Sequence, residues 1–134
     1  MKKTLSNPDS VAVPVGPYSH LATVEVGDAV FLYLAGQVAL DNEGNLVGQN
    51  NMPEQAEQVF ENIKAILEAS HAALEDVIKI TIFLTDMSNR DELRTMLRRY
   101  FPGTPPTSTL VQVSQLANPA LLIEVEAVAV IAKE

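Results

Sequence analysis

The stretch LLIEVEAVAVIA, residues 121–132, has the apolar, partly β-branched composition of a strand but contains two glutamates. Side chains two positions apart on a strand share a face. Glu124 and Glu126 therefore share a face with three apolar residues, Leu122, Val128 and Val130. The odd-numbered residues, from Leu121 to Ile131, are all apolar. This strand therefore needs cover on both of its faces.

The chain around this strand predicts more strands and two helices. Apolar side chains spaced three to four apart indicate helices at 53–70 and 88–101. Pro53 suits a first helical turn, and Ser88 with Asp91 predicts the N-cap and N3 positions of the second helix. Strands are predicted at 21–26, 29–40, 77–85 and 108–113, with a short strand near 46–47. The first 20 residues are expected to lie extended over the domain.

This order predicts an α+β fold in a single domain, residues 1–134: one sheet of about five or six strands with two helices on one face. Two helices bury only one face of a sheet, and the odd-numbered side chains of 121–131 fit beneath them. The even-numbered side chains then form an exposed apolar patch, and such a patch usually marks an interaction surface. We expect other copies of the chain to cover it. The alternative cover is the N-terminal segment.

Glu124 and Glu126 admit two interpretations at such a surface. Charged groups are seldom buried without partners. In the functional interpretation, one of the two orients a ligand or a water molecule in a cleft between subunits. In the structural interpretation, both form interface salt bridges or lie at an exposed strand end, and spacing alone favours this second interpretation.

Composition excludes several classes of function. The net charge of −8 argues against nucleic-acid binding, which rests on Lys and Arg. The chain has no cysteine, and His20 and His71 are far apart, so no metal site and no cofactor are expected. No apolar run is long enough to span a membrane, and the first residues do not resemble a secretory signal, so we expect a cytoplasmic protein.

Six segments in order resemble the RidA/YjgF family of reactive-intermediate deaminases: VGPYSH at 15–20, LAGQVALDNEGNLVG at 34–48, NIKAILEAS at 62–70, VIKITIFLTDM at 77–87, YFPGTPP at 100–106 and IEVEAVAV at 123–130. Each segment alone is a weak signal, but the set is specific and covers nearly the whole chain. The resemblance implies a chorismate-mutase-like fold. It also implies a homotrimer with inward-facing sheets and three small-molecule clefts between neighbouring subunits.

The resemblance also implies a chemistry. Active members hydrolyse imines and enamines derived from amino acids, releasing ammonia and a 2-keto acid. A tyrosine in the G-P-Y segment, the backbone of an S-G-Q segment and a glutamate on the last strand form the family site. These elements fall on Tyr18, Gly36 and Glu124, and the glutamate is expected to position the attacking water.

Four family positions differ in this chain. The arginine that grips the substrate carboxylate falls on Ser108, and the serine of S-G-Q falls on Ala35. The family's usual glutamine falls on His20, and a common asparagine on the second helix falls on Arg94. Losing a bidentate arginine contact is expected to cost several kcal/mol of binding.

Arg94 is a candidate for the missing cation. It belongs to the series Arg90, Arg94 and Arg98, which recurs every four residues on the second predicted helix. That spacing alone favours a solvated basic face. The sharper hypothesis is that Arg94 enters the cleft, while the Ser108 hydroxyl donates a hydrogen bond to the ligand.

Three functions follow from this reading. The first is a divergent hydrolase acting on imines or enamines, with a small, anionic substrate. The second is a non-catalytic trimer that binds a metabolite or serves a regulatory role, which the residues at 35 and 108 favour. Endoribonuclease activity, the third, is the least expected because the chain is acidic and lacks a patch that combines basic and aromatic residues.

Overall fold

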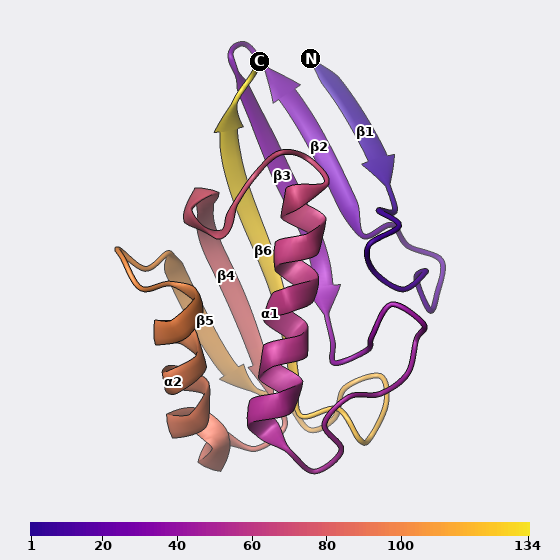
Figure 1. Ribbon diagram of the computed structural model, residues 1–134, viewed down its shortest axis with the longest axis vertical. Coiled ribbons are helices and arrows are strands. Elements are labelled where there is room, and N and C mark those ends of the chain that lie inside the picture. The colour runs from indigo at the N-terminus through magenta and orange to yellow at the C-terminus, as the bar shows by residue number, and fades with distance from the viewer.

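The computed structural model describes residues Met1–Glu134 and contains one mixed six-stranded sheet, shown in Figure 1. The strands lie in the order β1-β2-β3-β6-β4-β5, and only β4 and β5 are parallel neighbours. Their bounds are β1 Lys2–Ser6, β2 Leu21–Val26, β3 Ala29–Gln37, β4 Val77–Leu84, β5 Thr107–Gln112 and β6 Ile123–Ala132. The strand with the two glutamates, β6, thus lies inside the sheet between β3 and β4.

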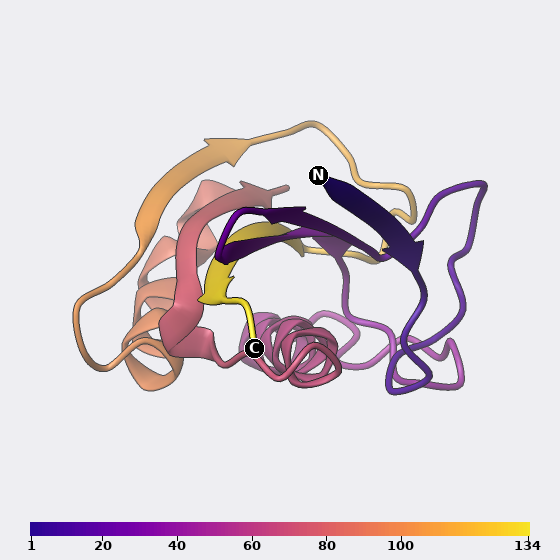
Figure 2. The ribbon, with the colours of Figure 1, turned by 90° about the horizontal axis from the view of Figure 1, so that it is seen from above.

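Two helices, α1 (Met52–Glu68) and α2 (Arg90–Tyr100), pack on the same face of the sheet, as Figure 2 shows. This arrangement confirms the predicted α+β class. The odd-numbered side chains of β6 from Ile123 to Ala129 are buried beneath the helices. The even-numbered side chains remain on the opposite face, which we call the open face.

Helix α1 carries the predicted apolar stripe into the core. The six apolar residues of this stripe are fully buried: Ala56, Val59, Phe60, Ile63, Ile66 and Leu67. Burial of a large apolar side chain contributes roughly 1.5–3 kcal/mol, so packing rather than helix propensity holds the helix in place. Pro53 lies in the first turn as predicted, and the side chain of Asn51 caps the helix by accepting a hydrogen bond from Glu54 N.

The predicted start of α2 was wrong. The helix begins at Arg90 with Asn89 at the N-cap, and Met87–Asn89 forms a separate 3-10 turn. The carboxylate of Asp86 accepts a hydrogen bond from the backbone N–H of Ser88 at 2.9 Å, which stabilises this turn and delays the helix.

Three strand predictions also need correction. Simple alternation along 77–85 puts Ile78 on the same face as the buried Ile80, but a bulge between Val77 and Lys79 turns its side chain outward and leaves Val77 buried. The short strand near 46–47 is a single bridge between Leu40 and Leu46. The first residues do not simply cover the domain, because Lys2–Ser6 pair with β2 and extend the sheet at its edge.

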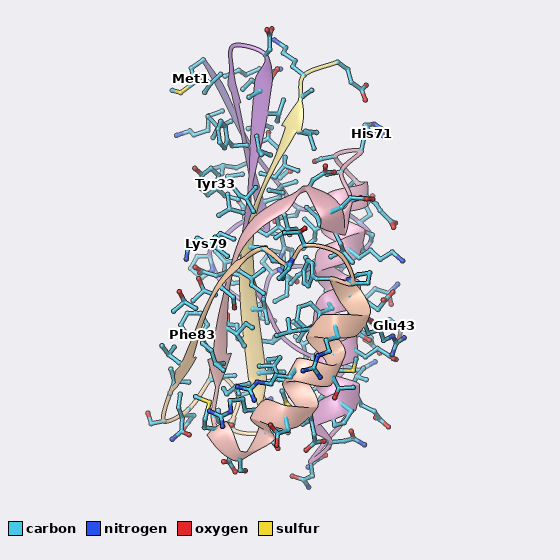
Figure 3. The ribbon with its side chains drawn as sticks, turned by 90° about the vertical axis from the view of Figure 1, so that its left-hand side faces the viewer. Met1, Tyr33, Glu43, His71, Lys79 and Phe83 are labelled. Atoms are coloured by element: carbon cyan, nitrogen blue, oxygen red, sulfur yellow. The ribbon has the colours of Figure 1, made fainter.

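The open face is largely apolar and has no cover within the protomer. Figure 3 shows Tyr33, Lys79 and Phe83 on the side away from the helices. Tyr33 lies opposite Val128, and Phe83 lies opposite Glu124, so the glutamates border this apolar surface. Tyr33 remains 49% exposed. An exposed patch of this kind is typical of an interaction surface.

Candidate functional site

The centre of the candidate site is a contact between β3 and β6. The register between these strands shifts between Leu34 and Gln37, and the irregularity contains Ala35 and Gly36. The Glu124 side chain lies over Gly36: a Cβ at position 36 would be 2.8 Å from Glu124 Cδ and closer still to its Oε2. Only glycine therefore leaves room for the carboxylate in this position.

Glu124 lies in an environment that favours its neutral form. Partial burial raises the pKa of the Glu124 carboxyl, and the nearby negative charge of Glu126 raises it further. Glu126, two residues along the same face, is exposed. The two glutamates therefore differ in environment, and the first is the better candidate for proton exchange.

Tyr18 and Gly36 line the same small hollow beside this contact. The Tyr18 ring meets the ring of His20 edge-on, with 5.9 Å between centroids. Tyr18 is itself exposed, so its hydroxyl is accessible to a ligand or to a neighbouring chain. Gly36 thus belongs both to this hollow and to the contact with Glu124, whereas neither Glu124 nor Ala35 lines the hollow.

His20 and Gln37 form the buried support of this region. His20 Nε2 lies 2.7 Å from the carbonyl oxygen of Ala12, and Gln37 Nε2 lies 3.1 Å from His20 Nδ1. Gln37 Nε2 also donates to the carbonyl of Ala35. These partners assign the proton of a neutral His20 to Nε2, with Nδ1 as the acceptor. Only 7% of His20 is exposed, so it is a buried structural side chain in this chain.

Two buried amides on α1 were not singled out from the sequence. Gln55 accepts a hydrogen bond from Leu122 N and donates to the carbonyls of Gly48 and Ala120. Asn62 donates to the carbonyls of Val38 and Leu40. Gln55 thus fixes the chain that leads into β6, and Asn62 fixes the chain that leaves β3. In the sequence, each of these amides is a polar residue next to an apolar residue of the α1 stripe.

Ser108 and Arg94 lie away from this region in the protomer. Ser108 pairs in register with Ile80, whose side chain is in the core, so Ser108 belongs to the helix-covered side of the edge strand β5. Glu124 pairs with Phe83 and belongs to the open face. Arg94 is exposed on α2 and lies 3.6 Å from Asp91 in an ion pair. One protomer therefore separates the predicted site residues into two groups.

The structure contains no cluster of three or more His, Asp or Glu residues arranged to hold a metal ion. Neither helix has the length and apolar character needed to cross a membrane.

Comparison with known proteins identifies the class to which this fold and site belong. Residues 9–131 match the model of the family described as Endoribonuclease L-PSP. The chain therefore belongs to this family, which includes the RidA and YjgF proteins, and the predicted family membership is confirmed.

Curated relatives and solved structures agree with this assignment. The chain is 36% identical to a RutC family protein of Pyrococcus abyssi over 96% of this chain and 98% of that protein. It is 32% identical to the 2-iminobutanoate/2-iminopropanoate deaminase of Dermatophagoides farinae, over 97% of each chain. The crystal structure of RidA from Psychrobacter sp. superposes with a TM-score of 0.83 at 36% identity, covering 96% of this chain and 99% of the other. These likenesses confirm the YjgF-like, chorismate-mutase-like fold.

Proposed function

We propose that this protein is a divergent RidA-family hydrolase that converts small imines or enamines derived from amino acids into keto acids and ammonia. The activity after which the Dermatophagoides relative is named supports this reaction class. The observation that carries the proposal is the half-buried carboxylate of Glu124 over the backbone of Gly36. A carboxylate with a raised pKa is a stronger base towards water than an ordinary glutamate.

In the proposed reaction, Glu124 orients a water molecule towards the imine carbon and accepts its proton. The C–O bond forms as the π electrons of C=N move to nitrogen, which takes up a proton. In the resulting carbinolamine, the hydroxyl proton passes through Glu124 to the amino nitrogen, the C–N bond breaks as C=O forms, and ammonia leaves. Tyr18, which lines the hollow with Gly36, is proposed to hold the substrate by a hydrogen bond, and the backbone at Ala35 and Gly36 to form the floor.

We infer that the complete site lies in a cleft between copies of the chain, with three clefts in a homotrimer. Two observations support this. The open face of the sheet has no cover within the protomer, and Ser108 lies on the side of the sheet opposite to Glu124. A neighbouring copy that docks on the open face would bring its β5 edge towards the Glu124 region and complete the site.

The proposed ligand is a small anion. Ser108 takes the position of the family arginine and is proposed to donate a hydrogen bond to the ligand carboxylate. Arg94 is the sequence-derived candidate for the cation. Its ion pair with Asp91 is exposed, and exposed pairs are worth little, so it does not prevent Arg94 from reorienting.

The decisive experiment generates 2-aminoacrylate or another imine in situ and follows keto-acid formation with wild type, Glu124→Gln and Ser108→Arg. The proposal requires wild-type turnover that Glu124→Gln abolishes or lowers at least about 100-fold. Equal rates with and without the protein would contradict it. Circular dichroism and sedimentation of each variant control for loss of fold or assembly.

A non-catalytic, metabolite-binding or regulatory trimer is the alternative, favoured by Ser108 and Ala35 at positions where the family carries arginine and serine. A silent wild type together with an active Ser108→Arg variant would support this alternative. Endoribonuclease activity, after which the family is named, is the least favoured function because the chain carries a net charge of −8.

A further inference from the structure

A groove of about 260 Å³ lies between the C-terminal end of α2, the proline-rich loop that follows it and the edge strand β5. Figure 1 shows α2 beside β5, joined by this loop. Most of the lining is uncharged, with Ile80, Leu97, Phe101 and prolines of the loop. Ser108 and Arg98 supply its polar side chains. A concave site with few, convergent polar groups is the usual form of a small-molecule site.

Ser108 reaches this groove because of its register on β5. It is paired with Ile80 and shares the helix-covered side of the sheet. Its neighbours Thr107 and Thr109 lie on the other side by strand alternation. The Thr107 hydroxyl is already engaged with the carbonyl of Ile78 at 2.7 Å. Ser108, by contrast, makes no hydrogen bond through its hydroxyl to another protein group, which leaves it available to a ligand.

Arg98 lacks a carboxylate partner, unlike Arg94 and Arg99 on the same helix. Arg94 pairs with Asp91, and Arg99 pairs with Glu57 at 2.8 Å. None of the four ion pairs in the protomer involves Arg98, and no acidic residue lines the groove. An unpaired guanidinium beside an apolar wall attracts an anion, and its planar fork fits a carboxylate with two parallel hydrogen bonds.

We propose that Arg98, rather than Arg94, replaces the lost family arginine, and that Arg98 and Ser108 together bind the carboxylate of a small 2-imino or 2-keto acid. This inference rests on the proposed function for its substrate class. Serine is much smaller than arginine, so it leaves space for a guanidinium that enters from α2. Arg98 is one helical turn beyond Arg94 and lines the groove with Ser108, whereas Arg94 does not line it.

The test uses 2-oxobutanoate, a stable keto acid, as the probe in calorimetric titrations of the intact protein. Arg98→Ala is expected to weaken binding about 30-fold or more, and Arg98→Lys to weaken it less because the charge remains without the fork. Ser108→Ala is expected to cause a smaller loss. Arg90→Ala removes another exposed arginine of the same helix that does not line the groove, and the affinity should stay at the wild-type value.

Restoration gives a second, independent readout. Ser108→Arg introduced into Arg98→Ala is expected to recover binding, since it returns a guanidinium to the same groove from β5. Thermal unfolding of each variant confirms that the exposed Arg98 side chain has been removed without loss of fold. Inorganic phosphate at the same concentration serves as the competing anion, and wild type should prefer the carboxylate.

The outcomes separate this inference from the proposed function. If wild type binds 2-oxobutanoate through Arg98 but hydrolyses no imine, the carboxylate site is supported and the proposed hydrolase activity is contradicted. If Arg98→Ala still hydrolyses the imine with an unchanged KM, the role of Arg98 is contradicted and the proposed hydrolase activity is supported. The assignment is also overturned if Arg94→Ala alone abolishes binding, if wild type binds phosphate more tightly, or if wild type does not bind 2-oxobutanoate.

Discussion

The carboxylate of Glu124 occupies the space that a side chain on Gly36 would need. The contact joins β3 and β6 at the one place where their register shifts. Gly36 has no left-handed backbone conformation, so its requirement for glycine comes from this contact and not from backbone strain. A substitution at position 36 therefore acts on the carboxylate.

Gly36→Ala is the first prediction. The added methyl group should push the flexible end of Glu124 away, so the fold survives while the carboxylate moves. We expect a stability change within about 1–2 kcal/mol and a loss of imine hydrolysis of at least about 10-fold, since small misplacements of a reacting group are costly. Thermal unfolding and initial rates measure the two effects. Unchanged rates would show that the carboxylate position does not matter. The matched Gly103→Ala change has open space around it and should leave the unfolding temperature unaltered.

Glu126→Gln should change the pH dependence of the reaction. The negative charge of Glu126 contributes to the raised pKa of Glu124, so neutralising it lowers that pKa. The ionised Glu124 is the form proposed to accept the proton of water. The acidic limb of the kcat/KM profile is therefore expected to move to lower pH. A profile that stays in place, or moves to higher pH, would contradict this coupling.

Glu124→Gln should alter stability in a pH-dependent manner. A carboxyl with a raised pKa in the folded state favours folding while it is protonated, and that contribution is lost as pH rises from the unfolded towards the folded pKa. The glutamine variant is neutral at every pH, so its folding stability does not fall in this way as pH rises. We expect the unfolding temperature of the variant to exceed that of wild type at pH 8 and the difference to shrink towards pH 4. A difference that grows on acidification would show that the sign of the pKa shift is wrong.

The sequence predicted the fold well because the signals were local. Strand alternation in 121–132 was enough to separate the buried from the open face, and the stripe of α1 was enough to identify the core. The misplaced residues are at element ends and bulges. Ile78 continues a perfect alternation in the sequence, but the bulge beside it depends on pairing with β6, which alternation cannot reveal.

The site was less predictable because its geometry depends on how distant segments meet. The family resemblance identified Tyr18, Gly36 and Glu124 as site residues, but it did not predict the contact between Gly36 and Glu124. It placed the candidate cation at Arg94 because of a family position. Which arginine of α2 lies beside Ser108 depends on the rotation of the helix over β5, and the structure selects Arg98.

Gln55 should be more important for stability than its polarity suggests. Replacement by leucine keeps the volume but leaves Leu122 N and the carbonyls of Gly48 and Ala120 without this partner. Unsatisfied buried groups are costly, so we expect Gln55→Leu to destabilise the fold by about 2–4 kcal/mol. Urea unfolding at a fixed protomer concentration measures the change. Gln115→Leu, on an exposed loop, should stay within about 0.5 kcal/mol, and equal effects of the two changes would argue against a structural role for Gln55.

Tyr33→Asp tests the assembly on which the cleft depends. Tyr33 is half exposed on the open face, opposite Val128, and an aspartate there costs little in an isolated protomer. In an assembly that buries this face, the same charge would be desolvated without a partner, at a cost of several kcal/mol. We therefore expect sedimentation to show a trimer for wild type and a monomer for Tyr33→Asp at micromolar concentration, with imine hydrolysis lost together with assembly. Asn42→Asp adds the same charge on an exposed loop and should remain a trimer. A wild type that sediments as a monomer, or a monomeric Tyr33→Asp that keeps full activity, would place the whole site within one chain.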